Sequence, residues 1–410
     1  MPQQPLTVEE AIQDWWEKRP HRSDLELLSA LAVLEKQYGT QLPRKELFKI
    51  HCEIPREVRE RSGATAILTA PADIGQEEAL KLCGQLLDNR HYTKLFGSSS
   101  PEPARGDAVL ARRSGSGMIV TGAREPLCIL LKNVLPKDLL GAVRPIVRKA
   151  ATQRKIAGGN RGVAAGTGMV QRRKRNGQIS NIKGAPHLQD LSDEDYARLR
   201  SATDGTFGFN SRGVRGGQVY PCRITHYSGA LPRDFALMGV LARTVAEAFK
   251  RSWVGEKWEA QFAKASQTAP TWLIRTSEGI TPFTTITCNS RWRTAAHVDK
   301  GDLKEGFGVM CCLGDFEGCD LVFPRYKVAV RYREGDVLLA NVHEVHGNTP
   351  LLNPDGSVPI VGREPERLVC VFYYQEKMEQ CERTIEKEHE FINKRERGES
   401  TKKKAKAAKA

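Results

Sequence analysis

FGVMCCLGDFEGCDLVFPRYKVAVRYREGDVLLANV, residues 307–342, is a series of short apolar segments separated by Gly, Asp and Pro. The segments are four to eight residues long, and many of their residues are β-branched or aromatic, as is typical of strands. Similar segments occur at residues 271–276, 283–289 and 368–375. Seven or eight strands at this close spacing predict a β-sandwich or barrel of the jelly-roll type.

Helical patterns lie mainly before these strands. Residues 8–19 and 24–39 combine helix-like apolar spacing with good helix formers. Residues 126–150 predict a strand, a turn and a helix that begins near Pro136. Residues 233–253 form the clearest amphipathic helical pattern of the second half. The predicted fold class is therefore α+β, with a jelly-roll core flanked by helices and a mainly helical N-terminal extension.

The chain of 410 residues is long enough for one large or two ordinary domains. Its composition turns to Ser, Pro, Gly and Arg over residues 97–117, which predicts a loop or linker. We therefore predict a mainly helical region of unknown role over residues 1–120 and a jelly-roll domain over residues 121–380. A charged surface helix and a disordered basic tail are expected over residues 381–410.

The sharpest candidate for a metal site lies in HVDKGDL, residues 297–303. His297 and Asp299 are two residues apart, so on a strand or at its end their side chains point to the same face. GDVLLANVHEVHGNTP supplies a further imidazole at His346, 47 residues beyond Asp299. Two imidazoles and one carboxylate make the facial triad that binds Fe(II) and leaves coordination positions free for chemistry.

Two histidines compete for the distal ligand position. His343 and His346 are three residues apart, so both cannot face the metal from a regular strand. We favour His346, which is followed by Gly347 and Asn348 at the expected strand end. His343 is the alternative ligand, or a group on the substrate side.

An anion anchor is expected at Arg367. A 2-oxoacid that chelates iron needs a cation for its far carboxylate, and the planar guanidinium of Arg holds a carboxylate with two hydrogen bonds. Arg367 begins a β run 21 residues after His346, and it shares a strand face with Val369 and Val371. Arg363 is the alternative anchor, and a surface position at the strand end is the alternative reading of Arg367.

The net charge of +14 and the pI of about 9.3 favour a polyanionic partner such as nucleic acid. From Leu139 to Gln189 the chain has eleven Lys and Arg residues and no Asp or Glu. This stretch includes Arg172, Arg173, Lys174 and Arg175 and is rich in Gly, which predicts a loop that faces DNA or a flexible surface loop. A second basic block, KKKAKAAKA, ends the chain.

Two further features concern the cellular setting. There is no apolar run of about 18 residues and no pattern of a signal peptide, so we expect no membrane association and a reducing compartment. The ten cysteines include no CxxC pair, and several lie within apolar strand-like runs. We interpret them mostly as small buried thiols rather than as a disulfide framework.

Several of these stretches together resemble the TET and J-binding-protein family of DNA dioxygenases: HVDKGDL, GCDLVFPRY, REGDVLL, HEVHGNTP and RLVCVFYYQ. HEVHGN and DLVFPRY are closer to the J-binding-protein branch, and RLVCVFYYQ is similar to the TET branch. KNVLPKDLL resembles the entry to the family's core, so the likeness covers about residues 125–380. The chain has neither the modified-base-binding insertion of one branch nor the cysteine-rich domain of the other, which leaves the substrate base open.

The resemblance implies a double-stranded β-helix and oxidation of a pyrimidine 5-methyl group, in thymine or 5-methylcytosine, with Fe(II), 2-oxoglutarate and O2. It implies that His297, Asp299 and His346 bind the iron and that Arg367 binds 2-oxoglutarate. The expected partner is double-stranded DNA with the target base flipped out of the stack. We expect a monomer located with DNA, in the nucleus of a eukaryote or in the cytoplasm of a bacterium or phage host.

Residues that contact DNA or the base are predicted around the ligands. Asn289 and Arg293 precede the first ligand and face either the cavity and the base or the solvent at the strand surface. Asp302 follows the first ligand closely enough to bind the base edge or to cap a turn. Tyr374 is a further candidate for the cavity wall or for the core.

Two rival functions remain open at the level of the sequence. A 2-oxoglutarate-dependent hydroxylase of a protein side chain or an N-alkylated base would use the same triad and the same Arg. A non-enzymatic DNA-binding jelly-roll protein would use the histidines structurally. Turnover of 2-oxoglutarate with Fe(II) separates the second rival from the enzymes.

Overall fold

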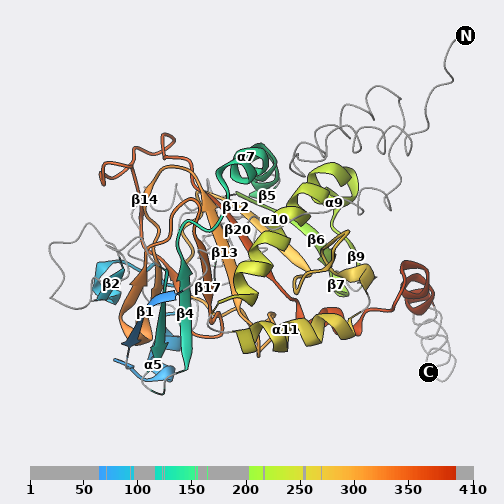
Figure 1. Cartoon of the computed structure of the whole chain (residues 1–410), viewed down its shortest axis with the longest axis horizontal. Helices are drawn as coiled ribbons and strands as arrows, with labels where there is room; N and C mark the ends of the chain where they lie inside the picture. Colours follow the sequence, from blue (N-terminus) through green and yellow to red (C-terminus); the bar gives the residue numbers. More distant parts are fainter. Residues whose placement is uncertain are drawn as a thin grey trace, which may run out of the picture.

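The computed structural model describes residues 64–70, 72–92, 94–96, 116–121, 123, 125–152, 154–155, 164, 203–215, 218–252, 255–268 and 270–393. Two sheets form the centre of this part of the chain, with helices packed on one side (Figure 1). The larger sheet has ten strands in the order β1-β3-β4-β17-β13-β20-β12-β6-β5, and β9 is paired to β6. The smaller sheet has the order β18-β15-β16-β2.

The strands of the larger sheet are β1 (Ala64–Ala70), β3 (Ser116–Thr121), β4 (Pro126–Leu131), β5 (Arg154–Lys155), β6 (Thr203–Asn210), β9 (Arg223–Ile224), β12 (Thr285–Ser290), β13 (Gly308–Leu313), β17 (Val337–Ala340) and β20 (Leu368–Tyr373). Those of the smaller sheet are β2 (Lys94–Phe96), β15 (Leu321–Phe323), β16 (Val328–Val330) and β18 (Gly347–Asn348). Three further strand pairs are β7 (Gly213–Arg215) with β8 (Gln218–Tyr220), β10 (Arg275–Thr276) with β11 (Gly279–Ile280), and β14 (Glu317–Gly318) with β19 (Leu351–Leu352). All strand pairs are antiparallel except β1 with β3 and β2 with β16, among those described.

The α-helices are α5 (Gln76–Lys81), α7 (Lys137–Ala151), α9 (His226–Ala230), α10 (Pro232–Lys250) and α11 (Gly255–Gln267), and residues 385–393 are also helical. Short 3-10 turns are η1 (Asn89–His91), η5 (Pro270–Trp272), η6 (Pro324–Tyr326) and η7 (Glu376–Gln380). No helix in the described ranges is both long enough and apolar enough to span a bilayer.

The period of two along the central strands divides their side chains between two cores. On β13, Val309 and Cys311 are buried in the core that contains α7 and α10. Met310 and Cys312 are buried in a second core, between the larger and the smaller sheet. Since successive side chains of a strand point to opposite faces, the continuous apolar run of this segment corresponds to a strand covered on both sides.

Helix α7 begins after Pro136, as expected, with Asp138 in its first turn and basic residues in its last turn. Both placements are favourable for the helix dipole. Leu140, Val143 and Val147 are buried, and their spacing of three and four residues puts them on one helical face. This face packs on the sheet face that does not carry the candidate site.

The prediction of an α+β fold with an antiparallel sheet is confirmed. The predicted β runs at 283–289, 307–313, 336–342 and 368–375 contain β12, β13, β17 and β20. The predicted run at 271–276 is different, because it forms the turn η5 and only the two-residue strand β10. Here Trp272 is buried, and its indole N–H donates to the carbonyl of Glu382 (2.5 Å), so tertiary packing overrides the local β preference.

The region before residue 121 differs in part from its predicted helical character. Its described residues form the strands β1, β2 and β3 as well as the helix α5 and the turn η1. The strands extend the two main sheets, so the sheets cross the predicted boundary. Residues 1–63, which contain the two predicted N-terminal helices, lie outside the described residues, as do 394–410.

One pair of cysteines departs from the predicted thiol state. Cys222 and Cys381 form a disulfide with their Cα atoms 5.9 Å apart. The other described cysteines are free, and most of them are buried: Cys83, Cys128, Cys288, Cys311, Cys312, Cys319 and Cys370. The disulfide joins positions 159 residues apart, so their proximity follows from the packing of the C-terminal segment and not from any local spacing.

Replacement of Gly314 by Ala is expected to destabilise the fold by about 2 kcal/mol or more. Gly314 has a φ of +115°, and an added Cβ would collide with the carbonyl oxygen of Glu366. A strained backbone residue alone costs about 1–3 kcal/mol. The midpoint of urea unfolding measures the loss.

The matched control is Gly141→Ala in α7. An added Cβ there has no heavy atom within 4 Å, and Ala is favoured over Gly in a helix by roughly 0.5–1 kcal/mol. The control is therefore expected to raise the unfolding midpoint slightly. If Gly314→Ala unfolds at the same urea concentration as wild type, the expected collision with the carbonyl oxygen of Glu366 does not occur.

Candidate functional site

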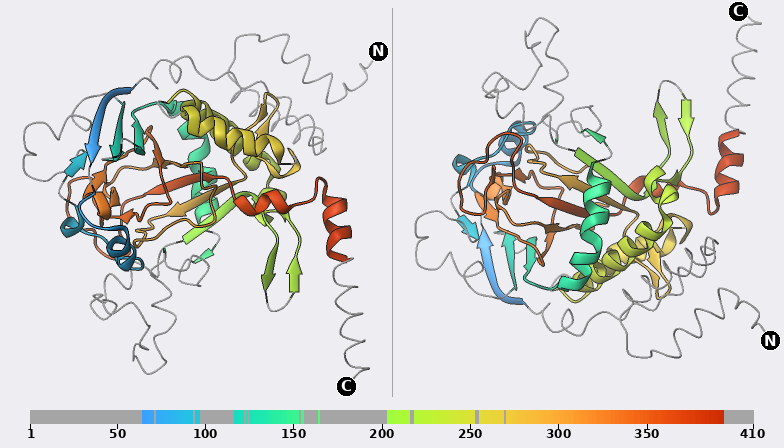
Figure 2. Two further views of the ribbon diagram at one scale, coloured as in Figure 1. Left: turned by 90° about the horizontal axis from the view of Figure 1, so that it is seen from below. Right: turned by 90° about the horizontal axis from the view of Figure 1, so that it is seen from above.

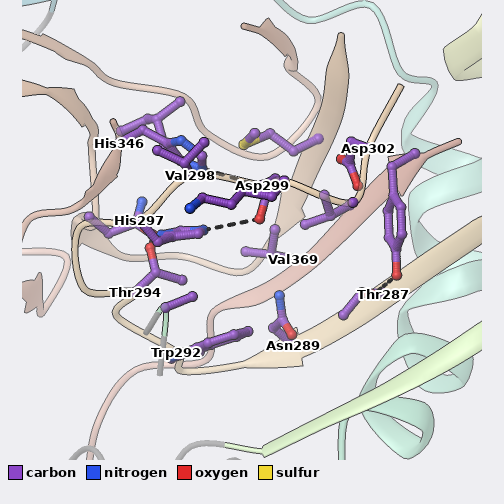
Figure 3. Close-up of a pocket in the computed structure, with 18 of the residues that line it drawn as sticks. Thr287, Asn289, Trp292, Thr294, His297, Val298, Asp299, Asp302, His346 and Val369 are labelled. Atoms are coloured by element: carbon purple, nitrogen blue, oxygen red, sulfur yellow. Dashed lines mark hydrogen bonds and ion pairs between the residues drawn. The ribbon is translucent and has the colours of Figure 1, made fainter. Parts of the chain in front are cut away.

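His297, Asp299 and His346 converge at one end of the space between the sheets (Figure 3). His297 and His346 form an isolated antiparallel bridge, in which the N–H of each donates to the carbonyl of the other (2.8 and 3.0 Å). The Nε2 atoms of His297 and His346 lie 3.5 and 3.7 Å from the two carboxylate oxygens of Asp299. One candidate ligand atom from each residue lies within 4.8 Å of the others.

Both imidazoles are oriented by the backbone. Nδ1 of His297 donates to the carbonyl of Ala295 (2.8 Å), and Nδ1 of His346 donates to the carbonyl of Glu344 (2.9 Å). A neutral imidazole that donates from Nδ1 keeps the lone pair of Nε2 for a metal. Burial, together with the nearby His297, lowers the pKa of His346 to about 4. His346 is therefore neutral at pH 7, as a metal ligand must be.

His343 lies outside this cluster. Its Nε2 contacts the carbonyl of Leu303 at 3.1 Å, and it is not among the residues that line the cavity at the candidate site. Asn341 accepts a hydrogen bond from the backbone N–H of His343 and so helps to fix the turn (3.2 Å). The structure thus brings His346, and not His343, beside Asp299.

A cavity of about 430 Å³ adjoins the cluster. Alternate residues of two neighbouring strands line it: Thr287 and Asn289 of β12, and Val369, Val371 and Tyr373 of β20. Its other polar lining residues are Ser211, Thr294, Lys300, Asp302, Tyr332, Asn348, Arg367, Gln375 and Lys377. A cavity of this size accommodates a small co-substrate together with part of a second molecule.

Arg367 is the most unusual charged group of the cavity, because it is only 2% exposed. Its Nη1 donates to the carbonyl of Trp292 (3.0 Å) and its Nη2 to the hydroxyl of Tyr332 (2.8 Å). Its Nε has no hydrogen-bond partner, and no carboxylate of the described residues forms an ion pair with Arg367. The nearby thiol of Cys319 does not compensate the charge, since burial raises its pKa.

A buried, uncompensated guanidinium is energetically unfavourable unless an anion pairs with it. The arrangement therefore fits a ligand that carries a carboxylate into the cavity. Phe316 lies on the guanidinium (5.5 Å from ring centroid to Cζ) and limits the approach of water.

The other predicted site residues have different positions. Asn289 and Asp302 line the cavity. Asn289 is 6% exposed, and its Oδ1 is buried without a hydrogen-bond partner in the described residues. Arg293 does not line the cavity, because its guanidinium donates to the carbonyls of Leu87 (2.6 Å) and Asn348 (3.4 Å).

The alternative anchor Arg363 is exposed on the loop before β20, and Tyr374 is a core residue. The hydroxyl of Tyr374 contacts Thr268, and its ring packs in a separate cluster with Leu273 and Leu303. The tyrosine of β20 that faces the cavity is Tyr373, because it shares the strand face of Arg367. Arg172, Arg173, Lys174 and Arg175 lie outside the described residues.

Several cavity residues were not expected from the sequence. The hydroxyl groups of Thr287 and Tyr373 are 3.1 Å apart on the neighbouring strands β12 and β20. Strand alternation from Asn289 and from Arg367 is the signal that identifies them. Tyr332 and Ser211 have no such local signal, because they enter the cavity from the segment after β16 and from the end of β6.

The donor set fits iron better than zinc. Two neutral imidazoles and one carboxylate form the triad of non-haem Fe(II) oxygenases, although some catalytic zinc sites use the same residue types. The cavity adds a buried Arg367 that needs an anion, and this requirement matches a co-substrate that chelates the metal and carries a second carboxylate.

Comparison with known protein families gives one domain match. Residues 234–376 match the Tet_JBP model, described as the oxygenase domain of the 2OGFeDO superfamily, whose cofactors are Fe(II) and 2-oxoglutarate. This range includes β12, β13, β20 and all three residues of the cluster.

Two curated relatives match part of the chain. The chain is 49% identical over 76 residues to the "Bifunctional helicase and thymine dioxygenase JBP2" of Leishmania infantum, which covers 18% of this chain and 7% of that protein. It is 37% identical over 121 residues to the "Thymine dioxygenase JBP1" of Leishmania tarentolae, which covers 29% of this chain and 13% of that protein. The match thus spans a small part of these relatives.

Among solved structures, "NgTET1 in complex with 5mC DNA" has a TM-score of 0.38 and 12% identity, over 75% of this chain and 94% of the other. "The structure of OsALKBH1" has a TM-score of 0.29 and 15% identity, over 60% of this chain and 97% of the other.

Proposed function

We propose that this chain, whose residues 234–376 are an oxygenase domain of the TET/JBP family, is an Fe(II)- and 2-oxoglutarate-dependent dioxygenase that hydroxylates the 5-methyl group of thymine or 5-methylcytosine in DNA. In this proposal His297, Asp299 and His346 bind the iron. Arg367 binds the far carboxylate of 2-oxoglutarate.

One observation carries the proposal: the three-residue cluster lines the same cavity as the buried Arg367, which forms no ion pair with a carboxylate of the described residues. A 2-oxoacid with a second carboxylate needs a metal at one end and a cation at the other. With Fe(II), 2-oxoglutarate and O2 bound, the site supplies an oxidation in which one oxygen atom enters the methyl group while 2-oxoglutarate becomes succinate and CO2.

The chain's own residues orient the reactants and exclude water. The backbone carbonyls of Ala295 and Glu344 fix the two imidazoles. The hydroxyl of Tyr332 and the carbonyl of Trp292 hold the guanidinium of Arg367 in place for a carboxylate. Val369 and Val371 make this part of the wall apolar.

The substrate side of the cavity offers polar groups for the edge of a base. The amide oxygen of Asn289 is buried without a hydrogen-bond partner among the described residues, and Asp302 also lines the cavity. A methyl group within a base stack cannot reach an enclosed metal, so we propose that the target base is flipped out of a DNA duplex. The JBP1 and JBP2 relatives are named as thymine dioxygenases, which supports a pyrimidine 5-methyl group as the target.

We further propose that the two facing sheets are a double-stranded β-helix that belongs to a catalytic domain over residues 121–380. The chain acts as a monomer at the cellular site of the DNA, and the basic residues Arg172, Arg173, Lys174 and Arg175 contact phosphates. An excess of Lys and Arg, with a net charge of +14, supports the DNA partner over a protein substrate.

Incubation of the full chain with Fe(II), 2-oxoglutarate and duplex DNA is expected to give a hydroxymethylated pyrimidine, detected by mass spectrometry of the released nucleosides. Two duplexes of the same sequence show which base is hydroxylated. In one of them thymine is the only 5-methylpyrimidine, and the other also contains 5-methylcytosine. Hydroxylation of a prolyl or lysyl peptide, or demethylation of an N-alkylated base, without either DNA product would overturn the proposal. Absence of any 2-oxoglutarate turnover would favour a non-enzymatic DNA-binding protein.

A further inference from the structure

The hairpin formed by β7 and β8 stands apart from the two main sheets. Its strands pair only with each other among the described residues, in the register Gly213 to Tyr220, Val214 to Val219 and Arg215 to Gln218. Figure 2 shows this hairpin, in green, projecting from the body of the molecule in both views. An isolated two-stranded hairpin is at best marginally stable in water, so another part of the chain has to hold it.

The base of the hairpin lies at the cavity. Ser211, two residues before β7, is one of the residues that line the cavity. Asn210 ends β6 and pairs with Arg223 of β9, so both legs of the hairpin leave the same corner of the large sheet. β6 is in turn the neighbour of β12, which carries Thr287 and Asn289. The arm therefore begins beside the substrate side of the cavity.

A buried carboxylate holds both legs of the hairpin. The side chain of Glu388 is fully buried and accepts hydrogen bonds from Nε and Nη2 of Arg212 (both 2.6 Å). It also accepts from the backbone N–H of Cys222 on the other leg (3.0 Å). Burial alone would raise the pKa of Glu388, but these hydrogen bonds, with one from the N–H of Glu382, bring it below its ordinary value.

Two further contacts tie the same base to the C-terminal segment. The disulfide between Cys222 and Cys381 joins the second leg to the residues after η7. The guanidinium of Arg212 lies over the ring of Phe391 in the helix at 385–393, with 3.8 Å between Cζ and the ring centroid. These contacts fix the base of the hairpin to the C-terminal segment, and the rest of the hairpin projects away from it.

The hairpin region carries only positive formal charge. Between Asp204 and Asp234 the sequence has no Asp or Glu and contains four arginines: Arg212, Arg215, Arg223 and Arg233. Arg212 is neutralised by Glu388. Arg223 is exposed and lies over the ring of Tyr220, with 5.3 Å between Cζ and the ring centroid. Arg215 is the last residue of β7, toward the end of the arm.

We propose that the β7–β8 hairpin is an arm that binds the DNA duplex beside the target base through its positive charge. This inference rests on the proposed function. Strands of three residues give an arm of roughly 10 Å at about 3.4 Å per residue. The major groove is about 12 Å wide and admits a two-stranded ribbon, and the charge of the arm matches a polyanion.

The double variant Arg215→Glu, Arg223→Glu of the full chain tests the arm. Its Kd for a fluorescent 20-base-pair duplex, measured by anisotropy, is expected to rise at least about tenfold relative to wild type. The slope of log Kd against log salt concentration is expected to fall by about two, since roughly one counterion is released per phosphate contact.

The matched control is the double variant Lys137→Glu, Lys250→Glu. It reverses two exposed charges on α7 and α10, which pack on the face of the larger sheet away from the cavity. This control has the same change in net charge, and it is expected to weaken binding less than threefold. If the hairpin variant binds the duplex as tightly as the control variant does, the inference is overturned. The hairpin edges, which pair with no other strand of the described residues, would then be a surface for a protein partner. A thermal melt of each variant checks that the fold is retained.

Failure of the arm and failure of the proposed function give different results. If wild type oxidises a DNA base but the hairpin variant binds and oxidises the duplex equally well, only the arm is refuted. If wild type converts 2-oxoglutarate to succinate without any oxidised base in the DNA, the proposed substrate is refuted, and the arm with it.

Discussion

Replacement of Asp299 by Ala is expected to lower 2-oxoglutarate-coupled oxidation by a factor of about a thousand or more. Asp299 is the only carboxylate of the cluster in the described residues, and its two oxygens lie 3.5 and 3.7 Å from Nε2 of His297 and His346. A bound metal contributes several kcal/mol to such chemistry, and each 1.36 kcal/mol is about tenfold in rate. His297→Ala and His346→Ala are expected to have effects of similar size.

The measurement combines succinate formation with metal affinity, determined by titration with Fe(II) under anaerobic conditions. His343→Ala is the matched control, because it removes the same side chain three residues from His346. Its imidazole contacts the carbonyl of Leu303 and not the cavity. The control is expected to keep its Fe(II) affinity within about threefold of wild type. Loss of iron in His343→Ala, with retention in His346→Ala, would show that the ligand assignment is wrong.

Replacement of Arg367 by Met is expected to raise the KM for 2-oxoglutarate by about thirtyfold or more. Loss of one partner of a buried, hydrogen-bonded charge pair costs about 2–5 kcal/mol, and each 1.4 kcal/mol corresponds to tenfold in affinity. Arg367→Lys is expected to recover only part of this loss, because an ammonium group lacks the planar pair of donors. Steady-state succinate formation at varied 2-oxoglutarate concentration gives the KM values.

Stability provides a second readout for Arg367. No carboxylate of the described residues pairs with the buried guanidinium, so removal of its charge relieves a desolvation penalty while two hydrogen bonds are lost. The free energy of unfolding is therefore expected to change by less than about 2 kcal/mol, so a high KM cannot be attributed to unfolding. The control Arg363→Met alters an exposed Arg. An equal rise in KM for both variants would exclude Arg367 as the specific anchor.

The chemical character of the site was predictable from local sequence. His297 and Asp299 are separated by one residue, and the short strand-like runs around them predict a β core that places both side chains on one face. Arg367 at the start of an apolar run is similarly informative, because alternation along β20 puts Arg367, Val369 and Val371 on one wall of the cavity. These signals extend over a few residues, and the backbone geometry of a strand is sufficient to interpret them.

Other features depend on contacts between distant segments, and the sequence carried little or no local signal for their geometry. The choice of His346 over His343 follows from a backbone bridge to His297 and from the turn that directs His343 to Leu303. Tyr332 reaches Arg367 from a separate strand connection, and Arg293 is turned away by two carbonyl groups. The histidine and Arg293 outcomes are decided by which backbone groups are left to accept or donate, and the Tyr332 outcome by a contact between two side chains.

The sequence by itself therefore determined the α+β class, the β core and the residue types of an iron and 2-oxoacid site, because strand period and side-chain chemistry are local properties. The tertiary structure alone decided that Arg367 is buried with no carboxylate partner among the described residues, and that Cys222 and Cys381 join. The tertiary structure also places the base of the β7–β8 hairpin beside the cavity. These features are set by packing between segments that are far apart in the chain, where no local pattern constrains the pairing.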